Sequence, residues 1–363
     1  MNRELLEVYS DYTRFTGHFL ISSFSYTTAT GLSGMLEGSI SHDKVTRFLS
    51  SESFDAKALW KSVKPLVRKY ERDDGVLVVD DTIIEKPYTD ESELVCWHYD
   101  HSSGRSVKGI NLVNVLYEAG GVRLPVNYAV VEKDQWVWDK KKGKEVRKSS
   151  VSKNEQVRMM LKACVQNTIK FRYIIADTWY SAAETMTFIA QKLERFFLLP
   201  LKSNRNVALS KQEKELGQYQ AVSSLALEQG RTYQVWVEQC SFPLLLTKLV
   251  FTNEDGTTGT LYLVSNDLTL DAERMNTLYQ RRWSVEEYHA SLKGNTALAA
   301  APTKTKRTQL NHVFASIYAF VKLEVMRVEV KLNHFALRSK LYLKALQASF
   351  DELRRLKAIS GLA

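Results

Sequence analysis

Val76-Leu77-Val78-Val79-Asp80-Asp81-Thr82 is the stretch that carries most of the argument about fold, because an apolar run ends there in two adjacent carboxylates. An apolar run of this length is typical of a buried strand. Tyr173-Ile174-Ile175-Ala176-Asp177 repeats the pattern later in the chain. A buried aspartate is costly unless it is paired or bound to a metal, so these strand ends indicate a site. The alternative is that each aspartate caps a turn or a helix, which is common.

A third acid follows on a predicted helix with the pattern Y-x2-R-x3-E-x6-K. The residues of this pattern are Tyr279, Arg282, Glu286 and Lys293. At about 100° per residue on one continuous helix, all four fall within about 60° of one another, whereas Glu287 faces about 100° away from Glu286. A phenol, a guanidinium and an ammonium group beside one carboxylate suit a DNA phosphate bound near a metal. The alternative is a solvated helix face with ordinary charge pairs.

The three acids together suggest metal chemistry. Two carboxylates at strand ends and one on a later helix can hold two divalent ions about 4 Å apart, an arrangement that cleaves phosphodiesters. Mg²⁺ is the expected metal, because it combines a few carboxylates with waters and substrate phosphates, and Mn²⁺ is a possible substitute. The sequence contains neither a Walker A pattern nor a dinucleotide fingerprint, so a nucleotide cofactor is not expected.

In their order, an Asp-Thr pair, a second Asp and the Y-R-E-K pattern resemble the DDE transposases of bacterial insertion sequences. More narrowly, they are similar to the insertion-sequence-four family and its close relatives. The resemblance covers roughly residues 70 to 300. It implies two groups of site residues: a catalytic and metal-binding triad of Asp81, Asp177 and Glu286, and DNA contacts from Tyr279, Arg282 and Lys293.

The first acid of that triad has an alternative. Adjacent residues on a strand point to opposite faces, so either Asp80 or Asp81 can face the site, but not both. Asp81 is chosen because the acid of the family precedes a threonine. The segment 178–180, Thr-Trp-Tyr, is bulkier than in many relatives, which leaves the local shape of the pocket open.

The resemblance also implies an α/β fold, with an RNase H-like catalytic core, a β-rich insertion and flanking helical regions. Apolar runs predict antiparallel strands over 110–117 and 124–131, joined at Gly120-Gly121. A helix is expected over 154–169, and residues 97–105 are expected to form a polar loop, with His98 and His101 as loop residues rather than metal ligands. The expected domains are a helical DNA-binding region at 1–70, the core at 71–200 and 266–300, the insertion at 201–265, and a helical region at 301–363.

Two flanking segments each have two possible interpretations. Ser41 is a suitable N-cap for a helix over 42–49, so helix, turn and helix form either a helix-turn-helix or an ordinary helical hairpin. Six basic residues crowd into 140–148. Such a run is either a solvated, mobile loop or a non-specific contact to DNA phosphates.

Bulk composition agrees with a globular DNA-acting protein. The chain has 363 residues, 44% hydrophobic content and a net charge of +9, which suits a polyanionic partner. Three scattered cysteines support neither a zinc ribbon nor a disulfide framework. The N-terminus does not resemble a signal peptide, and the apolar stretch 313–328 contains too many charges for a membrane span. We therefore expect a cytoplasmic, nucleoid-associated protein without a membrane partner.

The expected function is cut-and-paste DNA transposition. A metal-activated water would cut at the transposon end, and the freed 3′-OH would form a hairpin with the opposite strand before strand transfer. The expected partners are double-stranded DNA, as terminal inverted repeats and target, and a second copy of the chain assembled on DNA. The alternative is a transposase-derived DNA-binding repressor without catalytic activity.

Overall fold

The computed structural model describes residues 16–23, 26–100, 103–140, 143–252 and 255–360, without the side chains of 358–360. The chain divides into two compact units. The sheet unit comprises residues 60–83 and 90–286, and the helical unit comprises 1–59, 84–89 and 287–363. One strand and two helices begin in one unit and end in the other, so each unit is built from separate stretches of the sequence.

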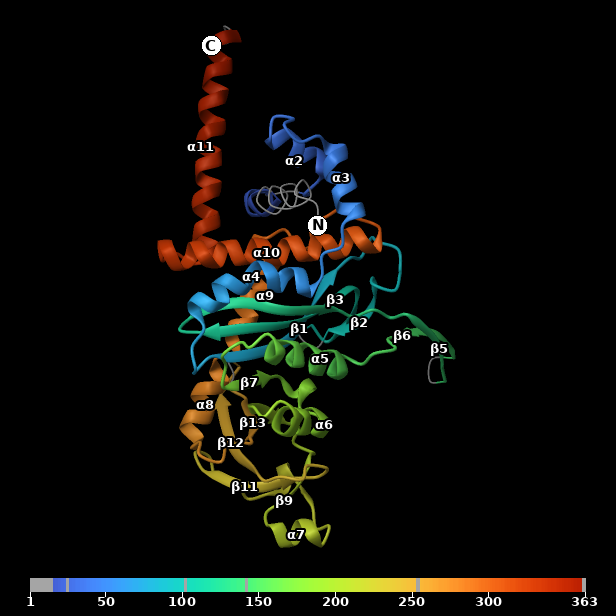
Figure 1. Cartoon of the computed structure of the whole chain (residues 1–363), viewed down its shortest axis with the longest axis vertical. Helices are drawn as coiled ribbons and strands as arrows, with labels where there is room; N and C mark the ends of the chain where they lie inside the picture. Colours follow the sequence, from blue (N-terminus) through green and yellow to red (C-terminus); the bar gives the residue numbers. More distant parts are fainter. Residues whose placement is uncertain (1–15, 24–25, 101–102, 141–142, 253–254, 361–363) are drawn as a thin grey trace. The chain divides into compact units, whose positions relative to one another are not determined.

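Five neighbouring strands form the centre of the sheet unit, in the order β4-β3-β1-β7-β8 (Figure 1). Their bounds are β1 Val76–Glu85, β3 Arg105–Ala119, β4 Val122–Val130, β7 Tyr173–Ala176 and β8 Phe196–Leu201. β3 and β4 are antiparallel, whereas β7 runs parallel to both β1 and β8. This is the strand order of an RNase H-like core within an α/β fold, as expected.

The turn between β3 and β4 lies where the sequence predicted it. Gly120 and Gly121 have φ angles of +56° and +77°, a conformation that favours glycine and suits a two-residue hairpin. The preceding strand is buried over most of its length, because neighbouring elements cover both faces of the sheet. A continuous apolar run, rather than an alternating one, is the sequence pattern of such a strand.

Five more strands extend the same sheet beyond β8. They pair antiparallel in the order β8-β13-β12-β11-β9-β10. Their bounds are β9 Asn206–Ala208, β10 Gln220–Ala221, β11 Thr232–Val237, β12 Leu244–Thr252 and β13 Thr258–Ser265. The β-rich segment therefore shares backbone hydrogen bonds with the central strands.

Helices of the sheet unit connect these strands. They are α5 Lys153–Gln166, the 3₁₀ turn Thr178–Tyr180, α6 Ala183–Thr187, the π-helical turn Phe188–Lys192, α7 Lys211–Glu215, the 3₁₀ turn Val222–Ser224 and α8 Ala272–Gln280. Ser152 caps α5 by accepting a hydrogen bond from the Glu155 amide at 3.2 Å, which fixes where this helix begins.

Two expectations about loops were wrong. Residues 97–105 are not simply a polar loop, because β2 (Cys96–Asp100) pairs antiparallel with the start of β3. The basic run at 140–148 is not simply a loop either. It belongs to a two-stranded hairpin of β5 (Gln135–Asp139) and β6 (Lys144–Lys148), although Lys141 and Lys142 lie outside the described residues. In β2 exposed aromatic residues alternate with half-buried ones, and β5 and β6 are mostly exposed, so none of these strands has a continuous apolar run.

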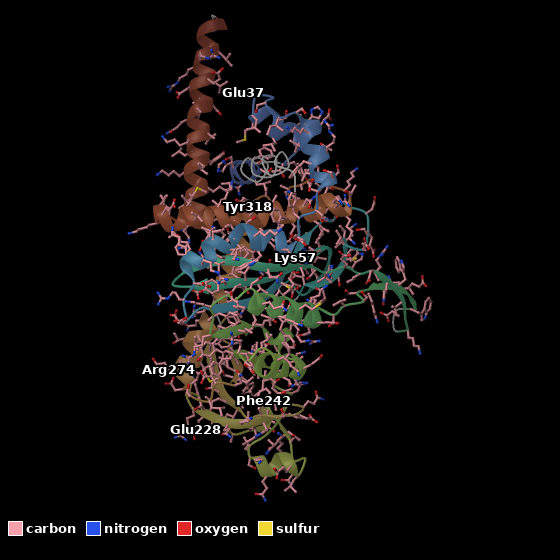
Figure 2. All side chains as sticks on the ribbon, in the orientation of Figure 1. Glu37, Lys57, Glu228, Phe242, Arg274 and Tyr318 are labelled. Atoms are coloured by element: carbon pink, nitrogen blue, oxygen red, sulfur yellow. The ribbon has the colours of Figure 1, made fainter. Side chains whose placement is uncertain are left out.

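The helical unit contains residues 16–22, which are helical, and several longer elements. These are α2 Ala29–Met35, α3 His42–Ser51, the start of α4 Ala56–Tyr70, most of α9 Trp283–Asn295, α10 Lys306–Val330 and α11 His334–Ser360. Ser41 caps α3 as predicted, accepting from the Lys44 amide at 3.3 Å. Leu20 and Ile21 pack with small residues of α10 in one core cluster. Tyr318, labelled in Figure 2, lies on α10 and stacks on Phe314.

A buried polar network connects α10 and α11. Glu324 is fully buried and accepts hydrogen bonds from Arg327 at 2.8 Å. Its carboxylate also lies 3.0 Å from the His334 ring, whose other nitrogen contacts Ser291 at 2.8 Å. A carboxylate without such partners would be costly to bury, so this network fixes how the two helices meet.

Candidate active site

Two aspartates of the sheet unit are placed together by strand register. β1 and β7 pair in parallel up to Val79 opposite Ala176. Asp80 is the next residue of β1, and Asp177 directly follows the end of β7 as the N-cap of the turn Thr178–Tyr180. The charge of Asp177 raises the pKa of Asp80, so the two carboxylates lie close enough to interact. Asp80 is 9% exposed and Asp177 is half-buried.

Glu286, in the first turn of α9, completes this acidic group within the sheet unit. Its carboxylate and that of Asp80 offer oxygens within 4.8 Å of each other. The Arg282 guanidinium contacts both: its Nη1 lies 3.3 Å from Asp80 Oδ2 and 3.1 Å from Glu286 Oε1. The strand does not end at Asp80 as the sequence suggested, because β1 continues to Glu85. One cationic group therefore bridges an acid in the middle of a strand and an acid on a helix that is distant in sequence.

The electrostatics of the group favour a further positive charge. Burial, reinforced by the nearby carboxylates of Asp177 and Glu286, raises the pKa of Asp80 to about 7, although Arg282 and the Asp81 amide oppose the shift. Burial also raises the pKa of Asp177, and the charge of Asp81 adds to this shift, while the Trp179 amide and Arg282 oppose it. Carboxylates that resist ionisation when crowded are stabilised as anions by a bound cation.

Asp81 has a different environment on the other face of β1. Its carboxylate accepts hydrogen bonds from Lys153 at 3.0 and 3.1 Å, Tyr180 at 2.6 Å and Asn111 at 2.7 Å. Burial alone would raise the pKa of Asp81, but Lys153, Tyr180 and Asn111 outweigh burial and hold it below its usual value. The two adjacent aspartates thus have opposite pKa shifts.

The bulky segment after Asp177 is explained by these contacts. Tyr180 is buried and donates its hydroxyl hydrogen to Asp81. Trp179 is 46% exposed, donates its amide to Asp177 at 2.9 Å, and has the Lys153 ammonium 5.0 Å from its ring centre. Lys153, Tyr180 and Asn111 had no recognisable sequence signal, because each comes from a different element.

The helix predicted over 279–293 is interrupted, so the single stripe expected there was wrong. α8 ends at Gln280 and α9 begins at Trp283. The amides of Arg281 and Arg282 bond three residues back, to Leu278 and Tyr279, which tightens the backbone. Arg282 nonetheless lies 6.0 Å from the centre of the Tyr279 ring. Burial raises the pKa of Tyr279 to about 12.

The remaining residues considered for the site, Lys293, Glu287 and His289, all lie on α9. Lys293 is exposed and follows Glu286 by two helical turns, whereas Glu287 lies on a different side of the helix. His289 follows Glu286 by three residues, is 5% exposed and was missed in the sequence. The spacing Glu-x-x-His places these two side chains on one face of α9 and was visible in the sequence.

His98 lies on β2 in the sheet unit. Burial, with the charges of Lys133 and Lys153, lowers its pKa to about 4, so its imidazole is neutral near pH 7. Its buried Nε2 has no hydrogen-bond partner within the described part of the chain. His101, the other half of the H-x2-H spacing, lies outside the described residues.

The residues present fit a divalent metal. Asp80, Asp177 and Glu286 supply oxygen donors, which Mg²⁺ and Mn²⁺ prefer. Burial, together with the charges of Asp177 and Glu286, raises the pKa of Asp80, and Arg282 only partly offsets them. These three residues therefore form an acidic cluster that is suited to binding a cation.

Comparison with known proteins defines the class. A family model described as DDE superfamily endonuclease matches residues 20–220, more than half of the chain, and the chain belongs to this family. The match includes Asp80, Asp81 and Asp177 and ends before Glu286. The chain is accordingly a member of a family of DDE endonucleases.

The search of curated proteins found no match. Among solved structures, the chain is similar to the Drosophila P element transposase strand transfer complex, with 9% identity and a TM-score of 0.25. The similarity covers 46% of this chain and 33% of that chain, so this chain spans about a third of that protein. A similarity this low carries no argument about fold or mechanism. No helix among the described residues is long and apolar enough to cross a membrane.

Proposed function

We propose that this chain is a cut-and-paste DNA transposase with Asp80, Asp177 and Glu286 as its catalytic carboxylates. The observation that carries the proposal is the convergence of Asp80 and Glu286 on Arg282, beside Asp177 on the neighbouring strand. The resemblance to the insertion-sequence-four family favoured Asp81 because of the following threonine. We propose Asp80 instead, because four hydrogen bonds from Lys153, Tyr180 and Asn111 already hold Asp81.

In this proposal the three carboxylates hold two Mg²⁺ ions, with Mn²⁺ as a substitute. Bound metal would lower the pKa of a water molecule and offset the charge that develops on the phosphate. The carboxylates would fix the position of the metal charge, and the burial of Asp80 would keep bulk water from screening the attraction between the metal and the carboxylate. Asp81, through its ion pair with Lys153, would hold the middle of β1 in place and orient the adjacent Asp80.

The reaction sequence contains two kinds of phosphoryl transfer. In cleavage, water attacks the phosphorus at the transposon end, the P–O3′ bond breaks, and a 3′-OH and a 5′-phosphate result. In joining, that 3′-OH attacks the phosphorus of another strand and displaces its 3′ oxygen. We propose that the first joining event forms a hairpin on the opposite strand, and that the last one inserts the element into target DNA.

Tyr279, Arg282 and Lys293 are proposed to contact DNA phosphates near the cleaved bond. Arg282 is the best placed, because its guanidinium group already lies beside two of the acids and can bind a phosphate in a bidentate manner. Contacts of this kind position the DNA without reading its sequence.

Cleavage by the purified protein tests the catalytic proposal. The substrate is DNA carrying the inverted repeats found by sequencing both flanks of the gene, and the readout is nicking with Mg²⁺. We expect Asp80→Asn, Asp177→Asn and Glu286→Gln to abolish nicking while repeat binding persists. Asp81→Asn should retain measurable cleavage. An inactive Asp81→Asn beside an active Asp80→Asn would move the site by one residue, and DNA binding without nicking by the parent protein would favour a repressor.

We also propose the domain roles expected from sequence. Residues 1–70 would bind DNA, 71–200 with 266–300 would form the catalytic core, 201–265 the β-rich insertion and 301–363 the helical C-terminal region. The DNA partners would be terminal inverted repeats and target DNA, in the cytoplasm at the nucleoid. What supports these roles is the family membership together with the chain's net charge of +9.

A homodimer on DNA is the proposed assembly. α11 spans 27 residues, and several of its apolar side chains are exposed. Among them Leu343, Leu346, Phe350 and Leu353 follow the alternating spacing of three and four residues that is typical of a coiled-coil seam. Sedimentation of the protein bound to repeat DNA tests this proposal: Leu346→Lys with Leu353→Lys should convert a dimeric complex into a monomeric one, and an unchanged dimer would exclude this seam.

A further inference from the structure

The β5–β6 hairpin is the least expected feature of the sheet unit. Among the residues that the structure describes, its strands pair only with each other and form a separate two-stranded sheet. Figure 1 shows it extending away from β2 and β3 of the same unit. An isolated hairpin is marginally stable at best, so one that carries large exposed apolar side chains calls for a functional explanation.

Two tryptophans lie on one face of this hairpin. Trp136 and Trp138 are two residues apart on β5, so they project to the same side. They are 56% and 60% exposed. Arg147, opposite Trp136 in the register, places its guanidinium 4.4 Å from the Trp136 ring centre. Arg147 also donates to the Lys133 carbonyl at 3.4 Å, so this part of the face is held in place.

The hairpin is also strongly basic. The sequence from 135 to 148 contains six Lys and Arg residues against two Asp and Glu residues, a surplus of four within a chain whose net charge is +9. Lys144 and Lys148 are exposed on β6. Their partners in the register place them on the face opposite the tryptophans. A DNA strand that contacts both faces of the hairpin would therefore meet aromatic rings on one face and ammonium groups on the other.

The base of the hairpin is anchored close to the acidic site. Asp134 accepts hydrogen bonds from Ser150 at 2.8 and 2.6 Å, which closes the base. Lys153, five residues after the end of β6, contacts Asp81. Five residues span at most about 18 Å, so the end of β6 lies within about that distance of Lys153 and of its partner Asp81.

We propose that the β5–β6 hairpin binds DNA with unpaired bases next to the cleaved bond, with bases stacking on Trp138 and Trp136 and phosphates contacting Lys144 and Lys148. The inference rests on the proposed function and adds a second DNA surface to it. Aromatic side chains within a basic surface are the combination that binds single strands without sequence preference. A purely apolar protein partner would not explain the surplus of positive charge.

The test measures oligonucleotide affinity in EDTA, so that no cleavage occurs. Three labelled probes are compared by fluorescence anisotropy: a duplex of about 30 base pairs, the same duplex with an unpaired flap, and a single strand. The length of about 30 is roughly twice the longest common single-strand site, which is about 16 nucleotides. Trp138→Ala should weaken flap and single-strand binding by about tenfold, since stacking on one aromatic residue contributes about fivefold to about a hundredfold. Duplex affinity should change less than flap affinity. Tyr88→Ala, which removes another exposed aromatic residue, is the matched control.

The lysines give an independent readout. Replacing both Lys144 and Lys148 with Ala should weaken all three probes and lower the slope of log affinity against log salt by roughly 1.4 to 1.8, from about 0.7 to 0.9 per phosphate contact. The control is Lys211→Ala on α7, at the other end of the sheet unit (Figure 1). Unchanged affinities in the tryptophan and lysine variants would overturn the proposal. So would loss of self-association in the tryptophan variants with DNA affinity intact, because it would identify a protein contact. Failure of the parent chain to bind or nick DNA would instead overturn the proposed function.

Discussion

Replacing Asp80 with asparagine should stabilise the metal-free protein, even though it should abolish cleavage. Its pKa, raised to about 7 from 3.8 chiefly by burial, corresponds to about 4 kcal/mol at 1.36 kcal/mol per pH unit. The folded protein binds this proton more tightly than the unfolded chain, so the contribution of Asp80 to stability is greatest below pH 4 and falls as the pH rises to about 7. An asparagine side chain at this position avoids that loss, because it carries no charge. It also keeps an oxygen for the Asp81 amide, which donates to Asp80 at 2.8 Å.

Urea denaturation in EDTA at pH 4 and pH 8 measures this effect. The free energies of unfolding of parent and Asp80→Asn should be similar at pH 4, and the variant should be more stable at pH 8 by up to about 4 kcal/mol. Adding Mg²⁺ at pH 8 should stabilise the parent and leave the variant nearly unchanged. A variant that is less stable than the parent at pH 8, or a difference independent of pH, would refute the reasoning.

Asp81→Asn is the matched control, and its effect should have the opposite sign. The pKa of Asp81 is held below its usual value, despite burial, by Lys153, Tyr180 and Asn111. Its ionised form therefore contributes stability that is present above about pH 4 and is lost as the pH falls through its folded pKa. We expect this variant to be destabilised at pH 8 and less so at low pH, in the same urea titrations.

Three further outcomes are expected. Gly75→Ala should reduce the free energy of unfolding by about 1 to 3 kcal/mol, because a Cβ there would lie 2.5 Å from the Tyr117 hydroxyl; urea denaturation of a matched exposed Gly→Ala variant gives the baseline. Tyr180→Phe should cost about 2 kcal/mol at pH 8, since it removes a 2.6 Å hydrogen bond to the Asp81 carboxylate, and the loss should shrink at pH 3. Lys293→Ala should lower the salt slope of repeat binding by about 0.9, and an unchanged slope would exclude a phosphate contact.

The fold was predictable where the sequence pattern had one explanation. The strands around Gly120-Gly121 and the strand ending at Ala176 were confirmed, because continuous apolar runs between turn residues are typical of a covered sheet. β2 was missed because its exposed aromatic residues alternate with half-buried polar ones, which looks like a loop in the sequence. The break between α8 and α9 was missed because it is made by tightened backbone hydrogen bonds and needs no glycine or proline.

The acidic site was harder to infer than the sheet. Asp80 and Asp81 are adjacent, and the threonine after Asp81 favoured that residue in the sequence, whereas the structure distinguishes them by their contacts with Arg282 and Lys153. The partners of Asp81 come from β3, α5 and the turn after β7, so no spacing in the sequence reveals them. The roles of Tyr279 and Lys293 stay predictions.

The hydrogen bonding of β8 to β13 has a consequence for how the protein unfolds and how it can be engineered. β8 is buried and almost wholly apolar, with β7 on one side and β13 on the other. Removing strands β9 to β13 would leave β8 as a bare apolar edge, a template for intermolecular pairing. A truncated chain should therefore aggregate rather than yield a smaller soluble enzyme, and hydrogen exchange should show amides of β7, β8 and β13 opening together as one cooperative block.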